Sequence, residues 1–186
     1  MRIVALLPFV LSLVGCGGGA GESYPQDWAL DVSPQAIELV EQLSWDSRAF
    51  YELVSTHAET ISNGSGLKFD LDGGAGVVEI NGAQDGAHGV LGSAIQGTAR
   101  ADVNMVQIFN HLFGHAPGRV ALTAYSMDEA ARMVAVIVVH EVGHAMSLPH
   151  NANSSVMRER VVLEPFVRHA FTLDEVEQLL RIRFGG

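Results

Sequence analysis

The chain has 186 residues, 11 of them basic and 21 acidic, with a formal charge of −10 and a single cysteine. That length suits one domain with an adequate core, and 48% hydrophobic against 17% charged residues exclude a disordered chain. The acidic balance argues against nucleic-acid binding, which needs a basic face, and one cysteine excludes an internal disulfide framework. We therefore expect a globular domain with no nucleic-acid partner, and nothing in the sequence implies an oligomer.

Residues 1–15 have the features of a secretory signal peptide. Arg2 precedes an apolar run over residues 3–11, which is shorter than the roughly 20 residues that a membrane-spanning helix needs. The only cysteine closes Leu13-Val14-Gly15-Cys16, which resembles the lipobox of bacterial lipoproteins. The resemblance implies cleavage before Cys16 and acylation of that residue. A plain signal peptide with an incidental cysteine is the alternative.

A glycine-rich tether is expected over residues 16–25, followed by the folded domain over 26–186. Several acyl chains anchor a protein stably to a membrane, so we expect the domain to be lipid-anchored in the bacterial cell envelope. Gly17 follows the cysteine, which resembles the pattern that directs lipoproteins to the outer membrane in Gram-negative bacteria.

The first half of the domain is expected to contain a short strand and a long helix. Residues 28–32 suit the strand, and Ser33 followed by Pro34 suits a helix start. Apolar residues then recur at helical spacing, so we predict a helix over about 34–60 with a break near 44–47.

Residues 67–125 show alternation typical of strands, separated by glycine-rich turns that include the stretch from Gly89 to Gly97. The alternating segments are 67–71, 78–80, 103–109 and 120–124. Asp70, Asp72 and Asp85 could form a calcium site, but their spacing does not match an EF-hand, and turn aspartates facing solvent are the favoured interpretation.

Two later segments carry capping-box signals for helices. Ser126 with Glu129 predicts a helix from Met127, although its β-branched run over 134–139 by itself favours a strand. A buried helix can be apolar on all sides, and the cap decides for a helix.

The C-terminal signal is similar. Thr172 with Glu175, and a hydrophobic staple between Phe171 and Val176, predict a closing helix over about 173–183.

The candidate chemistry begins with His140-Glu141-Val142-Gly143-His144, an HExxH motif. On a helix, residues four apart share one face, so both imidazoles can hold one metal ion. Glu141 points elsewhere and can act on a water molecule as general base without being a ligand.

Three later residues extend the motif. His150 lies ten residues after His140 and completes a set of three ligands with an open fourth position, the usual catalytic zinc arrangement. Pro149 requires the helix to stop first, so the chain can turn back toward the metal. Met157 follows seven residues after His150.

The run from His140 to His150, together with Ser155-Val156-Met157, resembles the HExxHxxGxxH signature and Met-turn of the metzincin zinc metalloproteases, in particular matrixin-like bacterial members. The resemblance implies zinc held by His140, His144 and His150, Glu141 as general base, and Met157 beneath the metal. The residues that match the family signature cover only about 18 positions of the chain.

The sequence departs from the family at Ser147, which stands where the family has glycine; if that position needs positive φ, serine is strained by about 1 kcal/mol. The tyrosine that astacins place two residues after the methionine is absent, so no fifth ligand is expected. His111 and His115 are also four apart, but the glycine between them and Pro117 favour a loop over a second zinc site.

We therefore predict an α+β, metzincin-like domain: a small mixed β-sheet packed on a long N-terminal helix and the zinc-motif helix, followed by a Met-turn and a C-terminal helix. The predicted function is a lipid-anchored zinc endopeptidase acting on peptide or protein substrates. A non-catalytic zinc-containing binding lipoprotein and a purely structural envelope protein are the alternatives.

Overall fold

The structure is a computed structural model that describes residues 24–62, 64–82, 90–113, 125–164 and 166–184. Several expectations lie outside these residues: the signal peptide, Cys16, most of the tether, the strand at 120–124, Asp85 and His115. In the described part of the chain, none of the helices combines the length and the hydropathy that crossing a membrane requires.

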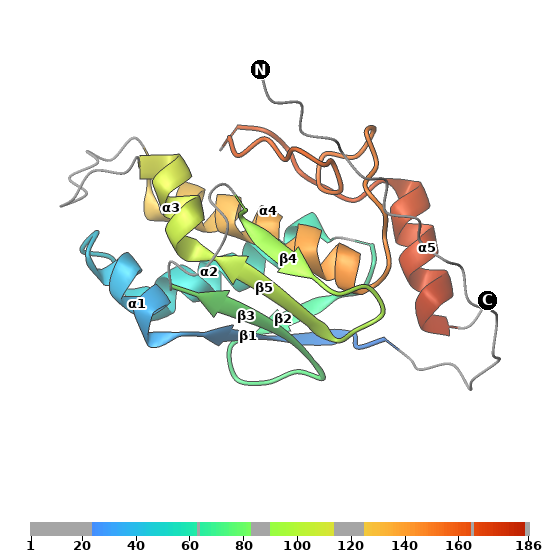
Figure 1. Cartoon of the computed structure of the whole chain (residues 1–186), viewed down its shortest axis with the longest axis horizontal. Coiled ribbons are helices and arrows are strands. Elements are labelled where there is room, and N and C mark those ends of the chain that lie inside the picture. The colour runs from blue at the N-terminus through green and yellow to red at the C-terminus, as the bar shows by residue number, and fades with distance from the viewer. Residues whose placement is uncertain (1–23, 63, 83–89, 114–124, 165, 185–186) are drawn as a thin grey trace, which may run out of the picture.

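The architecture is α+β, built on one five-stranded mixed sheet in the order β2-β1-β3-β5-β4 (Figure 1). The strands are β1 Asp27–Val32, β2 Lys68–Asp70, β3 Gly76–Asn81, β4 Gly92–Ala94 and β5 Arg100–Asn104. β1 pairs in parallel with β2 and β3, and β3 pairs in parallel with β5. Among the five described strands, only β4, at one end of the sheet, is antiparallel to its neighbour. The predicted mixed sheet is therefore confirmed, with a mostly parallel pattern.

The described helices are α1 Pro34–Glu41, α2 Ser47–Ile61, α3 Met105–Phe113, α4 Met127–Ala145 and α5 Leu173–Phe184. α2 and α4 lie behind the sheet, and α1 and α3 lie at its left end (Figure 1). α2 and α4 pack against each other, and α4 also packs against β4 and β5. α5 lies beyond the C-terminal end of α4 (Figure 1). α4 is thus the central helix of the domain.

The long helix expected over 34–60 is divided into α1 and α2, with the break close to where it was predicted. The side chain of Ser33 caps α1 by accepting the amide of Ala36. Asp46 caps α2, since its carboxylate accepts the amide of Ala49 at 2.8 Å. Between the helices Ser44 has a φ of 61°, which no helix can continue through. The left-handed backbone at Ser44 therefore separates the two helices, and Asp46 starts the second one.

The strand predicted through 103–109 is wrong beyond Asn104, where α3 begins. The side chain of Asn104 accepts the amide of Gln107 at 3.1 Å, as an N-cap does. The residues from Met105 to Phe109 are all buried, so the order of polar and apolar residues does not indicate which side of the segment faces the core. The alternation of Met105, Gln107 and Phe109 was therefore uninformative.

β4 was not predicted, because its residues were assigned to the glycine-rich turn between Gly89 and Gly97. Gly92, Ser93 and Ala94 have neither bulk nor β-branching, so local propensity does not favour a strand. Pairing with β5, where Gly92 lies opposite Val103, makes this segment a strand.

Both helices predicted from capping boxes are confirmed. α4 begins at Met127 with Ser126 and Glu129 in reciprocal hydrogen bonds. Its β-branched run from Val134 to Val139 is almost wholly buried, which explains why propensity was overridden. α5 begins at Leu173, after Thr172.

Candidate metal centre and cavity

The C-terminal end of α4 carries the first three residues of the candidate site. His140 and Glu141 are 7% and 6% exposed, and His144 lies one turn later with intermediate exposure. The helix ends at Ala145, before Pro149, as the sequence predicted.

The chain reverses direction directly after α4 and brings His150 back toward the helix. The amide of Leu148 donates to the carbonyl of Gly143, and the amide of Ser147 donates to that of His144, both at 2.8 Å. This is the Schellman pattern, which needs one residue in the left-handed region. Ser147 has a φ of 67°, so serine occupies a position that favours glycine. The expected strain of about 1 kcal/mol therefore applies here.

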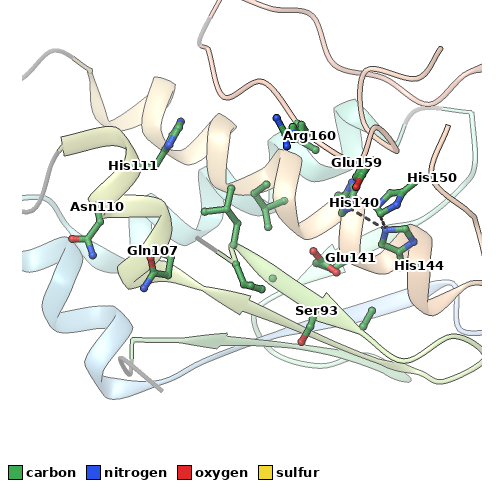
Figure 2. A pocket seen from close by; sticks show the side chains of 16 residues that line it. Ser93, Gln107, Asn110, His111, His140, Glu141, His144, His150, Glu159 and Arg160 are labelled. Atoms are coloured by element: carbon green, nitrogen blue, oxygen red, sulfur yellow. Dashed lines mark hydrogen bonds between the residues drawn. The ribbon is translucent and has the colours of Figure 1, made fainter. Parts of the chain in front are cut away.

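The three histidines converge on one point, with His140 buried, His144 intermediate and His150 exposed (Figure 2). The Nε2 atom of His144 lies 3.1 Å from Nε2 of His140 and 3.0 Å from Nε2 of His150. A tetrahedral zinc with Zn–N bonds of about 2.0–2.1 Å separates its nitrogen ligands by roughly 3.3 Å. The spacing is therefore close to that of a metal-binding triad.

The second ring nitrogens fix the orientation of two of these imidazoles. Nδ1 of His140 lies 2.7 Å from the carbonyl of Val156, and Nδ1 of His144 lies 2.9 Å from the carbonyl of Leu148. A carbonyl only accepts, so both Nδ1 atoms carry the hydrogen and both Nε2 atoms present lone pairs when the rings are neutral.

The electrostatics of these rings fit a shared cation. Burial, chiefly, lowers the pKa of His140 to about 4, and it also lowers the pKa of His144. Two neutral rings with facing lone pairs repel each other at 3.1 Å unless a positive ion lies between them. The donor set therefore suits a divalent metal ion.

A loop over residues 151–157 packs against the triad formed by His140, His144 and His150. The amide of Asn151 donates to the carbonyl of Met157 at 2.7 Å and closes the loop. Met157 is fully buried, and its sulfur packs against Gly143, where a Cβ atom would lie 2.5 Å away. Met157 thus lies against the motif helix between its two histidines.

Glu141 faces a different part of the site, beside β4. A Cβ atom on Gly92 would lie 2.7 Å from Oε1 of Glu141, so only glycine leaves room for this carboxylate. Burial, with a smaller contribution from Asp102, raises the pKa of Glu141 to about 7. A general base is most effective when its pKa is near the working pH, and this one is suited to that task. Gly92 was missed from sequence because it is one of several glycines in its segment.

The site opens into a cavity of about 1170 Å³. Residues of β4, including Gly92 and Ser93, line it together with Ile137 of α4 and the segment Glu159–Val161. Figure 2 shows the histidines and Glu141 gathered at one end of this cavity. The other end is lined by polar residues of α3, namely Gln107, Asn110 and His111.

The remaining candidate residues behave differently from the triad. His111 lies in α3, so the loop predicted for it is wrong there, and its partner His115 lies outside the described residues. Asp70 and Asp72 are exposed, and Asp70 accepts the amide of Asp72 at 2.9 Å, which supports the turn interpretation over a calcium site.

Two other histidines have structural contacts. His57 lies 3.0 Å from the carboxylate of Asp128, and Nδ1 of His169 lies 3.0 Å from the carbonyl of Ser155. In the described part of the chain, the triad is the one cluster of three or more side chains arranged to hold a metal.

Comparison of the sequence with protein-family models and with curated proteins gives no match.

Proposed function

We propose that this protein is a zinc-dependent endopeptidase of the metzincin type, anchored by lipid in the bacterial cell envelope. The observation that supports this most strongly is the convergence of His140, His144 and His150 at one end of a large cavity, with the buried carboxylate of Glu141 beside them. The order of the elements and the packing of Met157 against the motif helix add to the resemblance.

Zinc is the metal that this donor set favours. The three candidate ligands are imidazoles, and catalytic zinc sites have three protein ligands and one open position. When bound, the metal would polarise a carbonyl group and activate water at neutral pH.

The proposed role of Glu141 is to accept a proton from water and to deliver it to the leaving amine. Its carboxylate lines the cavity and is held between α4 and the backbone at Gly92. Its raised pKa of about 7 suits a group that must both accept and release a proton.

The proposed substrate is a peptide in extended conformation. β4 is an end strand of the sheet in the described residues and lines the cavity with Gly92, Ser93 and Ala94. An extended peptide can pair with the edge of such a strand through main-chain hydrogen bonds, which places its backbone next to Glu141.

Location in the envelope is proposed from Cys16, which lies outside the described residues. The first strand of the domain begins at Asp27, soon after this cysteine in the sequence, so a short connecting segment would hold the domain close to a membrane.

The test compares the full-length chain with its Glu141→Gln variant for zinc content and for cleavage of a peptide library. Glutamine keeps the shape of the side chain but cannot take a proton, so cleavage should fall by about 10²–10⁴-fold, mainly in kcat, with zinc content unchanged. Glu52→Gln is the matched control, because Glu52 is an exposed partner of Arg48 on α2, and it should cleave normally.

Three outcomes are informative. Equal cleavage by wild type and Glu141→Gln would contradict the role of Glu141. Zinc binding without any cleavage by the wild type would favour the binding lipoprotein. A purified wild-type chain without stoichiometric zinc would leave the structural envelope protein as the better interpretation.

A further inference from the structure

A buried carboxylate on the last helix is hydrogen-bonded to the loop that follows the third histidine. Glu175 is 4% exposed, and none of the described basic residues forms an ion pair with it. Its Oε1 accepts from the side-chain amide nitrogen, Nδ2, of Asn151 at 3.1 Å. Its Oε2 accepts from the hydroxyl of Ser154 at 3.0 Å and from the backbone amide of Thr172 at 2.8 Å. Hydrogen-bond donors therefore satisfy both oxygens of this buried carboxyl group.

The direction of the hydrogen bond from Ser154 is fixed by its other contacts. Its oxygen accepts the amides of Val156 at 3.1 Å and Met157 at 2.8 Å. A hydroxyl has two lone pairs and one hydrogen, so only the hydrogen is left for Glu175. The sequence predicted Glu175 as part of the cap of α5. Its hydrogen bond with Ser154 joins residues 21 positions apart, which the capping signal does not predict.

The same loop holds the metal site together. The carbonyl of Val156 accepts the hydrogen of Nδ1 of His140, and Asn151 directly follows His150. Glu175 thus contacts the loop at the residue beside one ligand and, through Ser154, at the residue that orients another.

We propose that Glu175 is a positioning residue, which holds the 151–157 loop so that His140 and His150 face the metal. The inference rests on the proposed metal site, but not on peptide cleavage. Partners that orient metal ligands typically change metal affinity by about 10–100-fold when they are removed.

The contacts also determine which substitution is disruptive. Glutamine at 175 introduces one NH₂ group, which must face either the Asn151 amide or the two donors at Ser154 and Thr172. Rotating the Asn151 side chain does not help, because its oxygen already accepts the amide of Asn153 at 3.0 Å. Every arrangement leaves one donor facing another.

Exchanging the amide at 151 and the carboxylate at 175 removes this conflict between donors. In the Asn151→Asp, Glu175→Gln double variant, a carboxylate at 151 accepts both the new NH₂ group and the amide of Asn153. The glutamine oxygen still accepts from Ser154 and Thr172. Asn151→Asp alone sets two carboxylates against each other and should weaken the site.

The experiment measures the dissociation constant for zinc by competition with a chelator, using the full-length chain in a double-mutant cycle. Glu175→Gln should bind zinc about 10–100-fold more weakly, and the double variant should return to the wild-type value. Val40→Ala, on the buried face of α1, should lower the melting temperature but leave zinc binding unchanged. Glu177→Gln, an exposed partner of Arg181 on the same helix, should change neither.

Unchanged zinc affinity in Glu175→Gln, or a double variant as weak as the single one, would overturn the positioning role. Tighter binding by Asn151→Asp alone would also overturn it, because charge near the metal would then explain the rescue. If Glu175→Gln does not fold, the double variant decides, since it must fold and bind zinc. A wild type that binds no zinc would overturn the metal site and this role together, whereas a wild type that binds zinc without cleaving peptides leaves the measurement intact.

Discussion

Replacing Gly92 by alanine should displace the carboxylate of Glu141 while leaving the three histidines in place. The new methyl carbon would lie 2.6 Å from Cγ and 2.7 Å from Oε1 of Glu141, and 2.8 Å from the carbonyl oxygen of Asp102. Non-bonded carbon atoms pack at about 3.5–4.0 Å, so the glutamate side chain must retreat by about 1 Å. The Asp102 carbonyl is part of β5 and yields less readily than a side chain.

The magnitude follows from this displacement. A misplacement of about 1 Å in a catalytic group can lower the rate by about 10²-fold. Overpacking costs about 1–3 kcal/mol in stability, and loss of a glycine from the unfolded chain offsets about 0.4–1 kcal/mol of that. Activity should therefore fall far more than stability, and the loss should appear in kcat.

The assay measures kcat, KM, zinc content and thermal unfolding of Gly92→Ala beside Gly73→Ala. Gly73 lies in the connection between β2 and β3, with no atom within 4 Å of an added Cβ, so it controls for the glycine-to-alanine change itself. Its stability should stay within about 0.5 kcal/mol of wild type, with normal cleavage. A Gly92→Ala variant with wild-type kcat would refute the reasoning, as would an equal loss in Gly73→Ala.

Two further predictions concern the anchor and the response to acid. Wild-type chain made in bacteria should fractionate with membranes and carry lipid mass, whereas Cys16→Ala should do neither; soluble wild type without lipid would contradict lipidation. Burial lowers the pKa of His169 below its unfolded value of about 6.5, so its contribution to stability is present above that pH and is lost as pH falls. His169→Asn, which retains a donor for the Ser155 carbonyl, should therefore lose less melting temperature than wild type on acidification from about pH 7 to 5, and equal losses would contradict this.

Local signals predicted the parts of the fold that are determined locally. The capping boxes at Ser126 and Thr172 placed the starts of α4 and α5, because a helix N-terminus satisfies its own amides with nearby side chains. The spacing of the histidines predicted their convergence for the same reason, since the helix and its terminal turn bring them together.

The sequence-based predictions were wrong or incomplete where contacts with residues distant in the sequence determine the local structure. β4 exists because Gly92 to Ala94 pair with β5, and the residues themselves do not favour a strand. The first five residues of α3 are all buried, so their polarity pattern did not distinguish a helix from a strand. The close approach of Gly92 to Glu141 depends on how α4 packs on the sheet, which no local pattern encodes.

The topology of the sheet also sets the order in which the protein can form. β1 pairs with both β2 and β3, and these parallel pairings join strands that are separated by connecting segments. Such non-local pairing slows folding, because long loops must close before the contacts stabilise them. The side chain of Asn151, beside His150, donates to Glu175 in α5, the last of the described helices. A chain still emerging during synthesis therefore contains the HExxH segment before it contains the carboxylate that accepts from Asn151.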